Sequence, residues 1–578
     1  MNLGPFLRDL EARLDRLTPA QIRQCILGCA RDLPPRRREN FLAIFSETSA
    51  APTRPAPPAS EGPADPTLIE DIEGLVSALE DGKYYEGYGW DHELQTKRAF
   101  GDESWVWEMD GLFERCADAY MDGDREVAGE GYGRLLHAFE MDEEVGHFCG
   151  PDYPTEMVET DLTEAKARYL RSLYETLSAD ERPARLLEEM QALSYVGSSE
   201  VGLADVREAE VDDPPGLDRF LPAWIELLEE KVARAPEAIQ YPGPDRRLRE
   251  RLLREATQMS AGTAGLEELA RKSGDHHPGA YYDWVAALVR EGALRRAIEA
   301  AREGTESIRE DSSRAILCDY LAHLAAETDD PELLCSARRM AWRADPAAER
   351  LIALWEAWEE RGSDVDRLMS EELQEFRRNG EETSDRLAAM LELGAGDYEA
   401  ATERALDALG WSNRHHPGPV VFPFLLLAVT GLTQAPPESR IETLVDALDY
   451  LRTRFLPPRY PFSDMDGIDV DQAYSDLLLS RLSGKPPPDS ERGQYLEASA
   501  SIARERMRAI VSNQHRKAYE RAASVMVALA EVHALIGEAE EGVEVVRGAR
   551  EEFPRHSAFR RELNALIASS PVLPDAEV

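Results

Sequence analysis

The stretch YYDWVAALVREGALRRAIEAARE, residues 281–303, has the pattern of two helices joined by a glycine turn. An apolar helical run ends at Gly292, and an amphipathic run follows with a small residue, Ala297, five positions after the glycine. Glycine adopts the left-handed conformation that ends a helix at little cost. A small residue one turn into the second helix lets the two helix axes approach closely. The stretch therefore predicts a helical hairpin.

The same spacing of a glycine and a small residue occurs at four more places. The pairs are Gly82 and Gly87, Gly123 and Ala128, Gly396 and Ala401, and Gly537 and Gly542. Alternating runs typical of strands are scarce, and we find no convincing pattern for a β-hairpin. We therefore expect an all-α fold: an α-α superhelical repeat solenoid of stacked helical hairpins, preceded by a small N-terminal helical unit.

Two of these stretches, residues 281–303 and AAMLELGAGDYEAATERALDALG at 388–410, resemble tetratricopeptide-type repeats. The core Gly-x-aromatic/apolar-x-x-Ala matches in both, with Leu294 and Tyr398 at the aromatic position. The tryptophan and proline positions of the full signature are irregular, and the units do not recur at a steady interval of about 34 residues. The resemblance implies a degenerate helical-repeat protein that binds a protein or peptide along its surface.

The C-terminal residues 515–567 are similar to the helical region that accompanies SWIM-type zinc fingers in bacterial and archaeal proteins. This likeness is carried by Tyr519, Ala522, Gly537, Glu541, Arg550 and Phe559. The finger itself needs a CxC motif followed by CxH, and the sequence has neither. The resemblance therefore implies a prokaryotic helical region without the zinc ion, and the nucleic-acid role of the finger does not transfer.

The composition divides the chain into six parts. They are a small helical unit (1–47), a linker rich in proline and alanine (48–66), a helical domain with an aromatic-rich first part (67–260), tetratricopeptide-like repeats (261–433), C-terminal helical repeats (434–568) and a flexible tail (569–578).

The chain is strongly acidic, with a formal net charge of −45 from 111 acidic and 66 basic residues. Such a surface repels nucleic acid and anionic membranes unless basic residues are segregated. The longest apolar stretch, residues 420–429, is too short to span a bilayer, and the first residues lack the pattern of a secretory signal. We therefore expect a cytoplasmic protein without membrane association. Whether the acidic charge reflects a salt-adapted host stays open.

Two pairs of adjacent histidines, His276–His277 and His415–His416, each precede Pro-Gly. Adjacent side chains point in different directions, and proline biases the residue before it toward extended geometry. We therefore interpret both HHPG motifs as connectors at the start of a helix. A metal site remains the alternative if the two pairs meet in space, but the sequence predicts neither a metal nor a cofactor.

Two patches are candidates for binding a partner. Residues 83–113 hold eight aromatic residues, which are typical of interface anchors but also of helical cores. Residues 503–522 are basic and could dock an acidic neighbour in the same chain or on a partner. The candidate partner-binding residues are Tyr84, Tyr85, Tyr88, Trp90, Trp105, Trp107, Arg504, Arg508, Arg516 and Lys517.

No phosphate-binding loop, nucleophile elbow, dinucleotide-binding glycine pattern or kinase signature is present. We therefore expect a non-catalytic scaffold or adaptor with a protein or peptide partner, and the oligomeric state stays open. One alternative is a nucleic-acid-associated protein that uses the basic helix. Another is an enzyme with a dispersed site on the repeats that uses histidine or cysteine. We interpret His147 and Cys149 as a detail of a loop, because a catalytic cysteine and histidine would come from distant positions in the sequence.

Overall fold

The computed structural model describes residues 65–573 except 92–95, 144–145, 152, 211, 234–243, 379–383, 409–414, 433 and 449–473. Before residue 65 it describes only Arg13, Arg16, Thr18 and Arg23. The N-terminal helical unit, most of the linker and the end of the tail expected from the sequence therefore lie outside the described residues. The chain splits into two compact units, Met1–Leu269 and Ala270–Val578. The finer domain ranges stay predictions.

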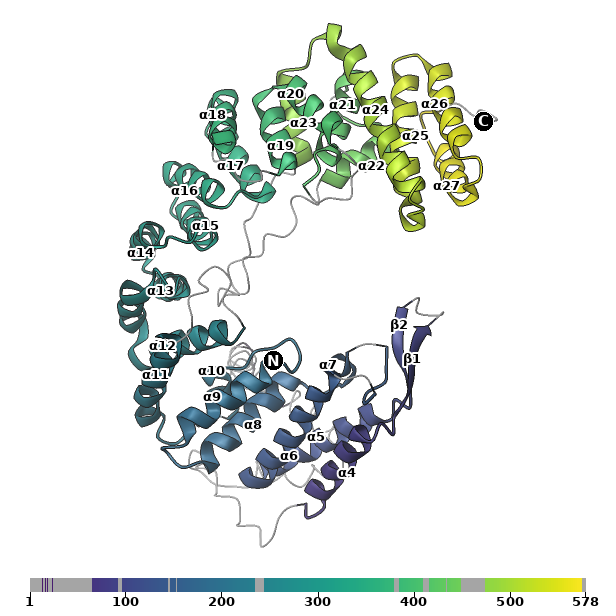
Figure 1. Ribbon diagram of the computed structural model, residues 1–578. Coiled ribbons are helices and arrows are strands. Elements are labelled where there is room, and N and C mark those ends of the chain that lie inside the picture. The colour runs from purple at the N-terminus through teal and green to yellow at the C-terminus, as the bar shows by residue number, and fades with distance from the viewer. Residues whose placement is uncertain are drawn as a thin grey trace. The chain divides into compact units, whose positions relative to one another are not determined.

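Unit 1 is a set of packed α-helices with one small hairpin (Figure 1). Its helices are α4 (Leu68–Glu80), α5 (Trp105–Met121), α6 (Arg125–Ala138), η2 (Phe139–Glu143), α7 (Pro154–Met157), α8 (Leu162–Thr176), α9 (Arg182–Leu193), α10 (Leu203–Glu208), α11 (Leu217–Ala233) and α12 (Pro244–Ser273), which breaks at Gly262 and runs past Leu269. Helices α4, α5 and α6 pack on one another, α6 packs on α8, and α8 packs on α9 and α10.

A β-hairpin follows α4, and here the expectation from the sequence was wrong. Strand β1 (Tyr85–Asp91) pairs with β2 (Thr96–Gly101) in antiparallel register, with a bulge between Tyr85 and Gly87. Gly82 does end a helix, with φ of +68°, but Gly87 lies in this strand instead of a second helix. The large side chains of YEGYGWD stand two positions apart, which suits a strand, and the interspersed glycines hide that alternation.

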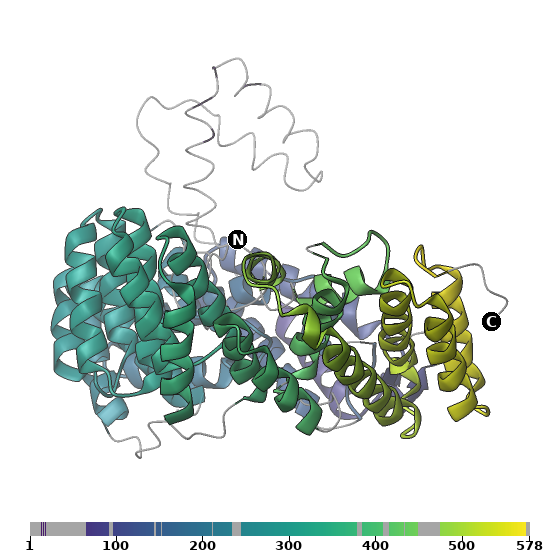
Figure 2. The same cartoon turned by 90° about the horizontal axis from the view of Figure 1, so that it is seen from above.

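Unit 2 is a series of helices in which each helix from α13 to α20 packs against the next one along the chain (Figures 1 and 2). Its helices are α13 (Gly279–Arg290), α14 (Leu294–Ser307), α15 (Asp311–Glu327), α16 (Pro331–Ala344), α17 (Ala348–Glu360), α18 (Val365–Arg378), α19 (Asp385–Ala395), α20 (Tyr398–Asp407), α21 (Gly418–Thr430), α22 (Arg440–Asp446), α23 (Tyr474–Gly484), η4 (Asp489–Glu491), α24 (Arg492–Val511), η5 (Arg516–Ala518), α25 (Tyr519–Leu535), α26 (Ala539–Glu552) and α27 (Ser557–Ala568). This sequential packing confirms the all-α helical-repeat fold. Among the residues that the structure describes, no helix has both the length and the apolar character required to cross a membrane.

The predicted glycine turns form in four of the five places. Gly123, Gly292, Gly396 and Gly537 have φ of 89°, 71°, 77° and 88°, and they join α5 to α6, α13 to α14, α19 to α20 and α25 to α26. The small residues that follow lie at the crossings: Ala128, Ala297 and Ala401 are fully buried. The spacing of the glycine and the small residue therefore predicts both the turn between the two helices and the position at which they cross.

Both HHPG motifs begin a helix, as expected. Pro278 is the N-cap of α13 and Pro417 is the N-cap of α21, so the glycine that follows is the first helical residue. His277 and His416 are buried, and Nδ1 of His416 accepts a hydrogen bond from the Gly418 N–H at 2.9 Å. Burial lowers the pKa of His416, so its ring is neutral and able to accept this bond. Among the described residues, no group of three or more His, Cys, Asp or Glu side chains is placed to hold a metal ion.

Replacing Ala297 by leucine tests the hairpin crossing. The larger side chain has no room between α13 and α14, so Ala297→Leu should lower the free energy of unfolding by about 1–3 kcal/mol. Urea denaturation measures this loss. Glu299→Leu, an exposed position on the same helix, is the matched control and should change stability by less than about 0.5 kcal/mol. Equal stability of the two variants would contradict the close crossing.

Candidate functional site

Two of the predicted aromatic residues belong to the core of unit 1. Tyr84 is 2% exposed and its hydroxyl donates to Oε2 of Glu108 at 2.9 Å. Burial and the neighbouring Glu108 raise the pKa of Tyr84 to about 12. Trp105 is fully buried and its indole N–H donates to the carbonyl of Cys149 at 3.0 Å. These two side chains attach the hairpin and α5 to the unit and present no surface to a partner.

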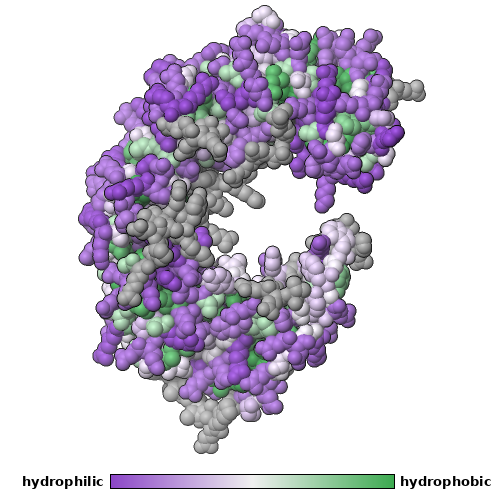
Figure 3. Space-filling view, viewed as in Figure 1, coloured by the Kyte–Doolittle hydropathy of each residue, from purple (hydrophilic) through white to green (hydrophobic). Residues whose placement is uncertain are grey.

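Three other aromatic residues of the same segment are exposed. Tyr88 is 60% exposed, Trp90 is 47% exposed and Trp107 is 68% exposed. Tyr88 and Trp90 stand two positions apart on β1, so they share one face of the hairpin, opposite Ala99 and Lys97 of β2. Tyr85 is half-buried. The hairpin is paler than most of the purple, hydrophilic surface around it (Figure 3).

The hairpin has one covered edge. Gly150 forms an isolated antiparallel bridge with Ala99 of β2, and its N–H donates to the Ala99 carbonyl at 3.0 Å. On the other side, no third strand pairs with β1 within the described ranges. The exposed aromatic face therefore adjoins a strand edge whose backbone groups are available for pairing.

The predicted basic residues lie near the C-terminal end of α24 and in η5. Arg504, Arg508, Arg516 and Lys517 are all exposed. Arg508 binds Glu552 of α26 through both carboxylate oxygens, at 2.5 Å and 3.2 Å. The other three form no ion pair in the part of the chain that the structure describes. One of the four thus docks on an acidic residue of the same chain.

The thiols in the described residues are poor nucleophiles. Cys116, Cys149 and Cys318 are buried, Cys335 is half-buried, and none forms a disulfide. Burial raises the pKa of each thiol, to about 12 for Cys116 and Cys318. All four therefore stay protonated at neutral pH. His147 contacts the Leu79 carbonyl through Nδ1 at 3.1 Å, so its ring is engaged with the backbone.

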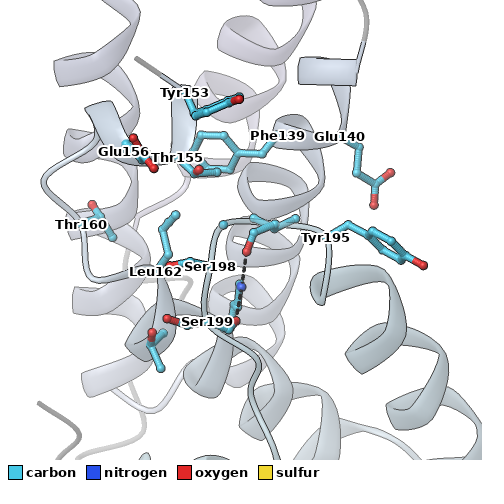
Figure 4. A pocket seen from close by; sticks show the side chains of 14 residues that line it. Phe139, Glu140, Tyr153, Thr155, Glu156, Thr160, Leu162, Tyr195, Ser198 and Ser199 are labelled. Atoms are coloured by element: carbon cyan, nitrogen blue, oxygen red, sulfur yellow. Dashed lines mark hydrogen bonds between the residues drawn. The ribbon is translucent and has the colours of Figure 1, made fainter. Parts of the chain in front are cut away.

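Unit 1 also contains a pocket that the sequence did not reveal (Figure 4). Its volume is about 550 Å³, and it lies between the start of α8, the loop that follows α9, and the segment from η2 to α7. The lining residues are Phe139, Glu140, Tyr153, Thr155, Glu156, Thr160, Leu162, Thr163, Lys166, Tyr195, Val196, Gly197, Ser198 and Ser199.

Lys166 is the buried charge of this pocket. It lies on the inner face of α8 and is 1% exposed, whereas the other six lysines of the chain are exposed. Its ammonium donates to the carbonyls of Val196 and Ser199, the latter at 2.8 Å. Burial lowers the pKa of Lys166 to about 8. A lysine on the apolar face of an amphipathic helix, in a chain with so few lysines, was the available signal in the sequence.

The acidic wall of the pocket is held by a histidine. Nδ1 of His137 lies 2.7 Å from Glu140, and its Nε2 lies 2.9 Å from Glu189, which also accepts a bond from Tyr169 at 2.9 Å. The bonds to Glu189 and Glu140 raise the pKa of His137 to about 9. His137 is therefore protonated at neutral pH, and its charge ties Glu140 to the buried Glu189.

No protein-family model matches the chain, and no curated protein matches its sequence. Among solved structures the chain is similar to a circular tandem repeat protein with a novel repeat topology, at 14% identity over 87% of this chain and 88% of that one, with a TM-score of 0.16. It is also similar to SYS-1, at 8% identity over 96% and 99% of the two chains, with a TM-score of 0.19. Scores this low carry no argument about function. The packing of successive helices defines the class, a helical-repeat protein, and the SWIM-related resemblance stays a prediction.

Replacing His137 tests the histidine clamp through its pH dependence. A folded-state pKa raised above the unfolded value of about 6.5 contributes stability that is complete below pH 6.5 and is lost as pH rises through about 9. His137→Gln should therefore lower the free energy of unfolding at pH 6 by on the order of 1 kcal/mol, a figure reduced for the screening of a side chain that is 34% exposed. The deficit should disappear near pH 10. A difference in free energy of unfolding between His137→Gln and the wild-type chain that stays constant from pH 6 to pH 10 would contradict this role of His137.

Proposed function

We propose that the chain is a non-catalytic, cytoplasmic interaction scaffold whose hairpin holds a partner protein. The observation that carries this proposal is the exposure of Tyr88 and Trp90 on one face of β1. Large aromatic side chains left in solvent mark interaction sites, because their burial by a partner stabilises a complex strongly. Tyrosine and tryptophan are also the residues that most often dominate binding energy.

The unpaired edge of β1 suits an extended segment of the partner. Such a segment adds a strand through backbone hydrogen bonds, and pockets or faces for alternate side chains provide the specificity. Tyr88 and Trp90 would then cover every second side chain of the added strand. Trp107 on the first turn of α5 is a further exposed anchor that follows the hairpin in sequence.

The basic residues give a second candidate function, association with a nucleic acid or with an acidic segment of a partner. The observation in its favour is that Arg504, Arg516 and Lys517 are exposed and form no ion pair with the rest of the described chain. Against a nucleic acid stands the small extent of the patch, because three exposed cations neutralise few phosphates of a ligand whose remaining charge faces a chain of net charge −45. We therefore assign the patch to an acidic protein segment.

The scaffold proposal predicts that removing the hairpin aromatics abolishes binding without harming the fold. Tyr88→Ser combined with Trp90→Ser should reduce recovery of a stoichiometric partner about tenfold or more, while the free energy of unfolding changes by less than about 0.5 kcal/mol. Affinity purification from an extract of the source organism, with quantitative mass spectrometry, measures recovery.

The matched control is Met340→Ser with Leu406→Ser, which removes two exposed apolar side chains of unit 2. It should leave recovery unchanged. Equal recovery with the hairpin variant, or no stoichiometric partner with the wild-type chain at native salt, would refute the proposal.

The assignment of the basic patch to an acidic protein segment predicts that the chain does not bind nucleic acid. A labelled DNA duplex and a labelled RNA should show no retardation by the wild-type chain at low salt, because too few cations are available to release counterions. Retardation that weakens with salt, and that is lost in the variant Arg504→Glu with Arg516→Glu, would instead establish the nucleic-acid role.

A further inference from the structure

A second depression of unit 1 adjoins the pocket of Figure 4, and we call it the Trp107 depression. Its volume is about 680 Å³, and it lies between the end of the β-hairpin, the first turn of α5 and the short helix α7. Glu156 of α7 lines this depression and also lines the pocket of Figure 4. The two cavities therefore adjoin at Glu156, and together they form what we call the α7 surface.

The α7 surface carries the three most exposed aromatic side chains of the described chain. Trp107 is 68% exposed in its depression, and Tyr153 and Tyr195 are 69% and 62% exposed in the pocket of Figure 4. They come from separate elements, since Trp107 is on α5, Tyr153 precedes α7 and Tyr195 follows α9. Tyrosine and tryptophan are enriched among the residues that dominate binding energy, so their gathering in two adjoining cavities marks an interaction surface.

Carboxylates line the same cavities as these rings. Asp102 accepts the N–H of Ser104 at 2.9 Å, which holds its carboxylate at the start of α5, the helix that carries Trp107 in its first turn. In the other cavity, Figure 4 shows Glu156 on the same side of the pocket as Tyr153. The α7 surface thus combines exposed aromatic rings with anionic groups.

Two of these carboxylates lack a cation. Asp102 and Glu156 are exposed, and neither forms an ion pair within the part of the chain that the structure describes. Glu103, which lines the same depression, differs because Arg98 binds it. A positively charged group that enters the Trp107 depression is therefore attracted by two carboxylates that nothing else in the described chain neutralises.

The guanidinium of arginine satisfies both the rings and the carboxylates. It stacks on the face of a tryptophan or tyrosine, and its planar fork of N–H groups donates to a carboxylate. Its methylene stem can lie on the apolar side chains of Val106, Pro151 and Met157, which also line the Trp107 depression. An apolar ligand would instead cover the carboxylates without a partner charge, and an acidic ligand would be repelled by them.

We propose that the α7 surface binds an extended segment of a partner protein that carries two or more arginines. One guanidinium stacks on Trp107 in the depression that Asp102 and Glu156 line, and another enters the pocket of Figure 4 against Tyr153. In an extended segment every second side chain points the same way, about 7 Å apart, so a single segment can supply a cation to each cavity. Neither cavity is lined by a residue of β1, so the inference goes beyond the role proposed for the hairpin.

Fluorescence anisotropy of a labelled peptide, Ser-Arg-Ser-Arg-Ser-Arg-Ser, with the full chain at physiological salt tests the ligand class. The matched probe replaces each arginine by citrulline, which keeps the shape of the side chain and removes its charge. The arginine peptide should bind, and the citrulline peptide should bind about tenfold more weakly or less, because it loses the cation–π and ionic contacts. Equal binding of the two peptides, or no binding of the arginine peptide, would overturn the proposal. Binding of N-acetylarginine amide as tight as that of the peptide would overturn it as well, since the site would then hold a single small cation.

Two double variants locate the binding. Trp107→Ser with Tyr153→Ser removes two exposed rings and should weaken the arginine peptide about tenfold. The same change on the hairpin, Tyr88→Ser with Trp90→Ser, should leave the affinity unchanged. Equal losses in the two double variants, or no loss in the first, would overturn the proposal.

A further pair of variants separates the α7 surface from general attraction to an acidic chain. Glu156→Gln removes the carboxylate that both cavities share and should weaken the arginine peptide about threefold. The matched control is Glu226→Gln on α11, which removes the same charge from an exposed position outside the α7 surface and should leave the affinity unchanged. Equal weakening by the two variants, or no weakening by Glu156→Gln, would overturn the proposal.

Discussion

A side chain at position 542 would have its Cβ 2.7 Å from the carbonyl oxygen of Ala530, and this closeness of two helix backbones is the constraint on which the fold depends. Ala128, Ala297 and Ala401 occupy the same place in their hairpins and are fully buried. Helices that approach so closely form a compact hairpin, yet each hairpin alone leaves an apolar face in solvent. The faces are covered only when another helix packs on them, which is why the helices from α13 to α20 follow one another in space in the order of the chain.

Such local constraints are readable from sequence, and they account for what was predicted. A glycine with positive φ and a small residue five positions later need no knowledge of the remaining structure, and neither does a proline that starts a helix after two histidines. The β-hairpin was not predicted, because glycines separate the aromatic residues of β1 and hide the alternation typical of a strand. Which aromatic residues are buried could not be predicted for another reason. Trp105 is buried, whereas Trp107, two residues later, is exposed. Which of them is covered depends on where the segment around Cys149 packs.

The pocket could not be predicted either, because it depends on residues that only the folded unit brings together. Its lining residues extend from Phe139 to Ser199 and come from several elements that meet only in the folded unit. The partners of Lys166 are backbone carbonyls, which leave no mark on the sequence. Lys166 departs from the pattern of its helix, as the buried Arg171 also does, because a charged residue occupies a position that Ala165, Ala167 and Leu170 identify as buried. A charged residue on the inner face of an amphipathic helix is therefore the sequence signal that points to such a site.

Two buried charges of unit 2 are held differently from Lys166. Glu372 of α18 is held by Arg339 and Arg343 of α16, and Glu392 of α19 is held by Arg377 of α18 and Arg404 of α20. These two buried carboxylates are neutralised by arginines of neighbouring helices, so the ion pairs fix the register between helices. The buried Glu531 differs, because it accepts from the backbone N–H groups of Arg440 and Ile441 and from the Ser570 hydroxyl. Lys166 is satisfied only by neutral carbonyls. The exposed aromatics are equally uneven: in the described chain Tyr88, Trp90, Trp107, Tyr153 and Tyr195 all belong to unit 1. The exposed aromatic side chains of the described chain thus gather in unit 1, whereas these buried ion pairs of unit 2 hold its own helices together.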